Sequence, residues 1–220
     1  MGIFNFLVII EEKVGVSMEF YQWLNEFFFE MDAGIFRAVN EIANSCPVIN
    51  KIARFISYFG DHGYFFIALV IVLLIFRKTR KVGIVLAIGM IFGALLNNVI
   101  LKSLVSRPRP YVTEDEFKEM WLTHSNVFMS SFSFPSGHTS TAAVIGVGLF
   151  LVNNKKFSWI FLLIPLLMGW SRIALFVHYP SDVLFGLIVG SLSAVGAYFL
   201  SNKLFKMKLI EKLTTGDKLF

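Results

Sequence analysis

The sequence has little charge and little cysteine, and both shortages limit what the protein can be. Charged residues make up 16% of the 220 residues, whereas a soluble domain carries about 25%. The single cysteine, Cys46, rules out a disulfide within the chain and leaves the redox compartment undetermined. The sequence also lacks low-complexity tracts and internal repeats of the length found in solenoid proteins. This composition is atypical of soluble domains and of repeat proteins.

The chain also lacks a basic patch, although its formal net charge is +5. Its lysines and arginines lie in separate short stretches, which excludes the concentrated positive surface of a nucleic-acid-binding protein. The N-terminal residues have no basic stretch before their short apolar run, so they make a poor signal peptide.

Long apolar runs are what the sequence has in abundance, since 56% of its residues are hydrophobic and 25 are Phe. A bilayer core requires about 20 mostly apolar residues per helix, and a helix satisfies its own backbone there. The run 63–76 is shorter, but reaches this length if its helix continues back through residues 55–60. We therefore predict an all-α integral membrane bundle with about five spanning helices. The four longer uncharged runs are 82–101, 139–154, 157–171 and 183–202.

The first 58 residues have a different pattern. Aromatic and apolar residues recur at helical spacing between Phe20 and Phe28, with glutamates largely on the opposite face. This pattern predicts an amphipathic helix, which either lies on the membrane surface or packs onto the bundle. A second such segment, 35–43, precedes the turn "SCPV". We divide the chain into an N-terminal amphipathic segment (1–58), a membrane core (59–202) and a basic tail (203–220).

The charges in the connecting segments predict the orientation of the bundle. Residues 77–81 hold four basic residues and no acid, residues 153–156 hold two lysines, and the tail holds five lysines against two acids. If successive spans cross the membrane in opposite directions, these three regions lie on one side. The positive-inside rule predicts that this side is cytoplasmic. The segments 102–137 and 172–182 then lie on the extracytoplasmic side, where the mixed polar stretch 111–133 suits a lid or cap.

Three polar clusters fall on that predicted outer side. Each cluster also has a structural explanation that involves no catalysis, because cations at helix ends reach toward headgroups and Asp182 could cap a helix. Taken together, three cations near a helix N-terminus suit a phosphate dianion. Two histidines and a carboxylate suit a nucleophile with a general acid. The clusters are "KSLVSRPRP" (102–110), "PSGH" (135–138) and "SRIALFVHYPSD" (171–182).

These clusters resemble the three motifs of the type 2 phosphatidic acid phosphatase superfamily, which includes lipid phosphate phosphatases and vanadium haloperoxidases. The motifs are Lys-x6-Arg-Pro, Pro-Ser-Gly-His and Ser-Arg-x5-His-x3-Asp, and all three match in order across residues 102–182. Arg107 is out of register, so the motif arginine is Arg109.

The resemblance implies a role for each matching residue. His178 attacks phosphorus and forms a phosphohistidine, while Asp182 orients its ring. His138 protonates the leaving oxygen and then activates water. The phosphoryl group is held by Lys102, Arg109, Ser136, Gly137 and Arg172. No stretch has the density of Asp, Glu and His expected of a metal phosphatase, so we predict neither a metal nor another cofactor.

The leading hypothesis is a membrane phosphatase for a lipid phosphate or diphosphate, with undecaprenyl diphosphate at the outer leaflet favoured. Phosphatidate and phosphatidylglycerol phosphate are alternative substrates within the same family. A vanadate-dependent peroxidase would share the anion site, but five apolar spans argue against it. A non-catalytic lipid-binding or transport protein should carry ionisable residues at mid-membrane, whereas here they lie at helix ends. The expected partners are the bilayer and the lipid substrate, without nucleic acid.

Overall fold

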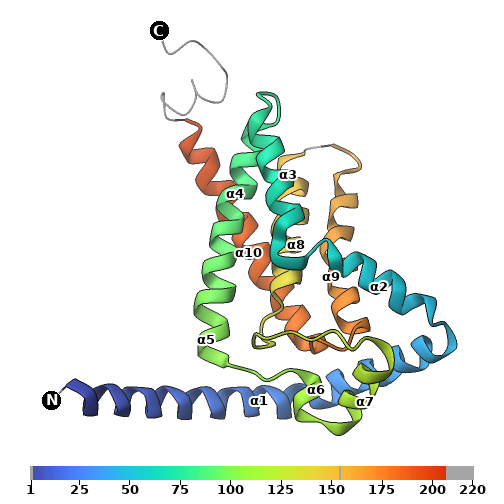
Figure 1. Cartoon of the computed structure of the whole chain (residues 1–220). Helices are drawn as coiled ribbons and strands as arrows, with labels where there is room; N and C mark the ends of the chain where they lie inside the picture. The colour runs from blue at the N-terminus through green and yellow to red at the C-terminus, as the bar shows by residue number, and fades with distance from the viewer. Residues whose placement is uncertain (1, 154, 207–220) are drawn as a thin grey trace.

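The computed structural model describes residues 2–153 and 155–206, with side chains from residue 19 onward, and these residues form helices without any strand. The predicted all-α class is confirmed. Figure 1 shows a bundle of upright helices and one long helix, α1, that crosses its lower end.

The upright helices come from the membrane core of the sequence. Three segments are long and apolar enough to span a membrane, namely Val48–Ile75, Arg80–Thr113 and Pro180–Leu204, and two shorter apolar ones are Gly137–Val152 and Ser158–Ala174. Together they agree with the predicted number of about five spans. The bundle elements are α3 (Tyr64–Ile75), α4 (Arg80–Ala94), η2 (Leu95–Leu101), α5 (Lys102–Val105), α8 (Gly137–Val152), η3 (Ser158–Leu162), α9 (Leu163–Ala174) and α10 (Pro180–Leu204).

Helix α8 is central, because it packs against α4, α9 and α10. Its buried face is made largely of small side chains, including Ala142 and Ala143. On α10, a Cβ at Gly186 would lie only 2.7 Å from the carbonyl oxygen of Ser136. Glycine thus lets the two backbones approach closely, as small residues do between membrane helices. This contact fixes the start of α8 against the start of α10.

The first span is bent. Helix α2 (Val48–Tyr58) is separated from α3 by the short turn η1 (Asp61–Gly63), in which His62 and Gly63 have φ values of 52° and 70°. The chain therefore changes direction there, and α2 slants from the base of α3 toward α1 (Figure 1). The helix of the 63–76 run therefore does not continue unbroken through residues 55–60: residues 55–58 are the end of α2, a helix of different direction.

Helix α1 (Gly2–Ser45) is continuous. The expectation of a separate segment at 35–43 is therefore wrong, because the helix continues through Gly34 without a break. Buried residues recur on one face from Leu24 through Phe36 to Ala43, whereas Trp23 and Phe27 are exposed. One face of α1 thus packs onto the bundle, as one of the two readings anticipated. Its location at the membrane surface stays a prediction.

A small cap lies beside α1, made of α6 (Pro110–Thr113) and α7 (Asp115–His124) (Figure 1). The rings of Phe36 and Phe117 pack edge to face with centroids 5.0 Å apart, and Arg37 donates to both carboxylate oxygens of Glu116 at 2.8 and 2.9 Å. The cap covers the 102–137 side of the bundle. The turn between α3 and α4 and the C-terminal end of α10 lie at the opposite end.

The division of the chain into residues 1–58, 59–202 and 203–220 stays a proposal. Residues 207–220 of the predicted basic tail lie outside the described residues.

Candidate active site

His178 lies at the centre of the site, in the buried loop between α9 and α10. Its Nε2 is 2.9 Å from Nη1 of Arg109. A guanidinium can only donate, so Nε2 is the accepting nitrogen and the ring hydrogen of a neutral His178 is on Nδ1. Nδ1 faces Asp182, with 3.5 Å to Oδ2. The lone pair on Nε2 therefore points away from the carboxylate.

The protonation state of His178 follows from its surroundings. Burial lowers the pKa of this imidazole well below its ordinary value, and the positive charges of Arg109, Arg172 and Lys102 lower it further. His178 is consequently neutral at neutral pH, which is the form that can act as a nucleophile.

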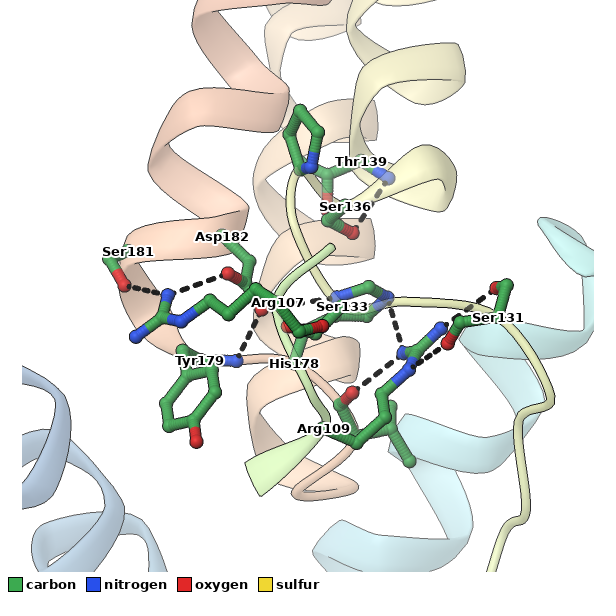
Figure 2. Close-up of polar contacts among 12 residues, drawn as sticks. Arg107, Arg109, Ser131, Ser133, Ser136, Thr139, His178, Tyr179, Ser181 and Asp182 are labelled. Atoms are coloured by element: carbon green, nitrogen blue, oxygen red, sulfur yellow. Dashed lines mark hydrogen bonds and ion pairs between the residues drawn. The ribbon is translucent and has the colours of Figure 1, made fainter. Parts of the chain in front are cut away.

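Asp182 is fixed from two sides. It is the third residue of α10 and is completely buried. Its Oδ2 accepts the backbone N–H of Tyr179 at 3.0 Å, and its Oδ1 accepts Nη1 of Arg107 at 2.7 Å. Asp182 is therefore not the N-cap of α10, which is Tyr179, but the third residue whose carboxylate accepts the N-cap N–H. The same carboxylate also lies beside His178 (Figure 2).

Arg107 is the residue that reasoning from the motifs missed. It is 1% exposed, and besides Asp182 it donates to Ser181 Oγ at 2.8 Å and to Asp32 Oδ2 at 3.1 Å. Asp32 belongs to α1 and also accepts the backbone N–H of Ser181 at 2.8 Å. The only feature of the sequence that pointed to Arg107 was the repeated Arg-Pro pair. The motif spacing selects Arg109, so it gave the first arginine of the pair no role. Arg107 connects α1 to the carboxylate beside His178.

Arg109 holds the other side of His178. Besides the contact with Nε2, it donates to the carbonyl oxygens of Val177 at 2.7 Å and Ser131 at 2.8 Å. Figure 2 shows Arg107 and Arg109 reaching the His178–Asp182 pair from opposite sides. Two arginines separated by one proline therefore have separate partners.

Arg172 and Lys102 complete the positive charge of the site. Arg172, on α9, is completely buried; its Nη1 contacts Ser57 Oγ, while Nε and Nη2 have no hydrogen-bond partner among the described residues. Lys102, at the start of α5, donates to Ser131 Oγ at 3.3 Å. Buried guanidinium N–H groups are costly without an acceptor. This arrangement suits an anion with several oxygens.

The start of α8 supplies further donors. Ser136 caps the helix, with its Oγ accepting the backbone N–H of Thr139 at 3.4 Å, and its own N–H donates to the carbonyl oxygen of Asp182 at 3.0 Å. Gly137 and His138 follow in the first turn, where free N–H groups favour an anion. His138 lies at the loop-to-helix junction that the sequence predicted, and its Nε2 is 3.0 Å from Oδ1 of Asp61.

Five of the eight predicted site residues line one cavity of about 720 Å³. Its wall also includes apolar side chains of α3 and α4, namely Ile67, Met90 and Ala94. The predicted residues in the wall are Lys102, Arg109, Gly137, His138 and His178. Ser136, Arg172 and Asp182 are completely buried and do not line the cavity.

No group of three His, Cys, Asp or Glu residues arranged to hold a metal is found within residues 2–153 and 155–206. The expectation of a metal-free and cofactor-free site stays a prediction.

Comparison with known proteins gives consistent results. Residues 80–206 match the model of the PAP2 superfamily. The chain is 29% identical over 192 residues to an undecaprenyl-diphosphatase of Sulfolobus acidocaldarius, covering 87% of this chain and 81% of the relative. It is 32% identical over 159 residues to the undecaprenyl-diphosphatase BcrC of Bacillus subtilis, covering 72% and 78%.

A solved structure is also similar. The crystal structure of a transmembrane PAP2-type phosphatidylglycerolphosphate phosphatase from Bacillus subtilis superposes with a TM-score of 0.66 at 27% identity, covering 89% of this chain and 98% of that chain.

Proposed function

Since the chain belongs to the PAP2 superfamily and is a multi-pass membrane phosphatase, we propose that it hydrolyses undecaprenyl diphosphate through a phosphohistidine intermediate. The observation that carries the proposal is a single cavity with cations and His178 at one part of its wall and apolar residues of α3 and α4 at another. A phosphate with a long apolar tail fits both surfaces.

In the first step, Nε2 of His178 attacks the terminal phosphorus. The bond from phosphorus to the bridging oxygen breaks, and the lipid monophosphate leaves. The ring keeps its Nδ1 hydrogen, and the Asp182 carboxylate stabilises the positive charge that develops on the imidazole, which is the orienting role of a triad carboxylate. Arg109 releases the Nε2 lone pair by moving its Nη1 onto a phosphoryl oxygen.

His138 gives its proton to the bridging oxygen as that bond breaks. In the second step it takes a proton from water, whose oxygen attacks the phosphohistidine and releases inorganic phosphate. Lys102, Arg109 and Arg172, with Ser136 and the Gly137 N–H, stabilise the charge on the equatorial oxygens in both steps. The reaction needs no metal in this scheme.

Two observations support the choice of substrate. The names of two similar proteins specify undecaprenyl diphosphate, and Lys102 and Arg109 also line a second cavity of about 470 Å³ beside the first. That second space can receive the other phosphate of a diphosphate while the isoprenoid tail lies along α3 and α4.

A second candidate is phosphatidylglycerol phosphate, favoured by the TM-score of 0.66 to the phosphatidylglycerolphosphate phosphatase. The deciding measurement is kcat/KM of the purified protein for undecaprenyl diphosphate, phosphatidylglycerol phosphate and phosphatidate in mixed micelles. We expect undecaprenyl diphosphate to be preferred. A preference of tenfold or more, about 1.4 kcal/mol, for either glycerolipid would overturn the choice.

The same proposal places the site on the extracytoplasmic side of the cell membrane. The basic turn between α3 and α4 lies at the end of the bundle opposite α1 and the site (Figure 1), and basic connections favour the cytoplasm. In this orientation α1 lies along the outer surface, where its exposed Trp23 and Phe27 meet the headgroup region.

A further inference from the structure

Asp61 contacts the second histidine of the site although it lies outside the three motifs and outside the residues matched by the family model. Its Oδ1 is 3.0 Å from Nε2 of His138, across 77 residues of sequence. Both residues are in the wall of the 720 Å³ cavity. The site therefore contains two histidine–carboxylate pairs, of which the motifs describe one.

The turn that carries Asp61 is shaped to lie against the His138 ring. A Cβ at Gly60 would be 2.5 Å from Cδ2 of His138, so only glycine allows this contact. Gly63 donates its N–H to the carbonyl oxygen of Gly60 at 3.1 Å, and both His62 and Gly63 have positive φ. These features close the turn tightly and direct Asp61 toward the ring.

The contact fixes which nitrogen of His138 carries which hydrogen. A carboxylate can only accept, so Nε2 carries a hydrogen directed at Asp61. The nitrogen left to exchange a proton with substrate is Nδ1. A flipped ring would offer Nε2 instead, and the contact with Asp61 disfavours it.

The contact also bears on the charge of His138. The cations near it are Arg172 on α9, Arg109 before α6 and Lys102 on α5, with the neutral His178 close by. Burial of the ring and these like charges disfavour the imidazolium that a general acid requires, whereas the adjacent carboxylate favours it. Asp61 is the one carboxylate within the described residues that contacts this ring.

We propose that Asp61 is a positioning residue that holds His138 through Nε2 and favours the charged form of the ring from which the proton is donated. As the phosphorus–oxygen bond of the substrate breaks, the Nδ1 proton of His138 passes to the leaving oxygen. The Nε2 hydrogen stays with the ring and remains bonded to Asp61, which keeps its negative charge. The neutral His138 then takes one proton from water in the second step. This inference rests on the acid role given to His138 above.

The test uses two substrates that need the acid to different degrees. An alkyl phosphate such as phosphatidate has a poor leaving group, whereas p-nitrophenyl phosphate leaves without protonation. The rate measured is phosphoenzyme formation in a single turnover, because the second step is the same for both substrates. Asp61→Asn should lower this rate for phosphatidate by between about tenfold and hundredfold, with KM little changed, and lower it for p-nitrophenyl phosphate less than about threefold. Asp61→Glu, which keeps the carboxylate, should recover part of the loss. Asp115→Asn, which removes an exposed acid of α7, is the matched control and should behave as wild type.

A second arm separates this inference from the proposed function. His138→Ala should show the same dependence on leaving group, and adding Asp61→Asn to it should cause no further loss. If His138→Ala slows phosphoenzyme formation from both substrates equally, the acid role itself is wrong. If His138→Ala behaves as expected but Asp61→Asn is equally harmful to both substrates, or its effect adds to that of His138→Ala, the positioning role is wrong. The unfolding temperatures of Asp61→Asn and of a second variant, Asp61→Ser, show whether a loss of activity reflects a loss of fold.

Discussion

Arg107 Nη1 lies 2.7 Å from Oδ1 of Asp182, and both side chains are almost completely buried. The same guanidinium contacts Asp32 of α1 at 3.1 Å. The carboxylate that faces His178 is therefore held by an arginine that also fastens a helix lying across the end of the bundle. The position of Asp182, and with it the tautomer of His178, depends on residues from three separate parts of the chain.

Replacing Arg107 should damage both stability and turnover. Arg107→Ala leaves Asp32 and Asp182 buried without their cation, and breaking such a pair costs about 3–5 kcal/mol. We expect a clear fall in the unfolding temperature in detergent and a fall in kcat with KM little changed, because Arg107 holds Asp182 rather than substrate. Arg107→Lys, which keeps the charge but not the planar fork, should lie between Arg107→Ala and wild type.

Arg37→Ala is the matched control for that variant, since it also removes an arginine that connects α1 to another element. Arg37 and its partner Glu116 are exposed, so we expect little change in unfolding temperature or kcat. Equal effects of the two substitutions would show that any loss of α1 contact, and not the Asp182 pair, explains the result.

His178→Ala should reduce kcat by about 10⁴-fold or more, because the proposed nucleophile is removed. His138→Ala should still form a phosphoenzyme with p-nitrophenyl phosphate, since that leaving group needs no proton. The measurement is acid-labile phosphate on the denatured protein after brief exposure to labelled substrate. Wild-type turnover by His178→Ala would refute the assignment of the nucleophile.

The pH dependence of stability should carry the signature of His178. The pKa of His178 is lowered by burial, so the folded imidazole stays neutral as the pH falls below about 6.5, where the unfolded one takes up a proton. Stability that is present above this pH is therefore lost as the pH falls toward the folded pKa. Between pH 7.5 and pH 5.5, the unfolding temperature of the wild type should fall further than that of His178→Asn. Parallel curves for the two proteins would contradict a neutral His178.

Chelation should leave activity unchanged, and vanadate should inhibit. The proposed mechanism stabilises the transition state with Lys102, Arg109 and Arg172, and vanadate takes up the five-coordinate geometry of phosphorus in that state. The measurement is phosphate release in the presence of EDTA, and separately with increasing vanadate. Activity that is lost on chelation and restored by one divalent ion would overturn the mechanism.

The orientation in the membrane can be tested with the native cysteine. Cys46 is exposed in the junction between α1 and α2. This junction lies at the end of the bundle that α1 crosses (Figure 1). An impermeant maleimide should label it in intact cells. In a Cys46→Ser background, Thr123→Cys on α7 should react in the same way, whereas Lys78→Cys, in the turn before α4, should react only after the membrane is opened. The reverse pattern would turn the site toward the cytoplasm.

Much of the architecture follows from the sequence alone because it depends on local properties. The apolar runs predict membrane helices since each helix satisfies its own backbone hydrogen bonds. Asp182 follows His178 by four residues across the start of α10, so the short spacing in the motif already keeps the two side chains near each other. The start of α8 is likewise local, with Ser136 capping the residues that follow it.

Other relationships were decided only when the helices packed. The motif register assigned a role to Arg109 and none to Arg107, yet Arg107 contacts Asp182, 75 residues away. Asp32 and Asp61 lay in the part of the chain that the motifs did not cover, and they contact Ser181 and His138 across 149 and 77 residues. The continuity of α1 and the bend between α2 and α3 also determine where these acids lie. Sequence spacing records only neighbours along one helix, whereas a buried charge takes its partner from whichever helix the packing brings within hydrogen-bond distance, because burial without a partner is too costly.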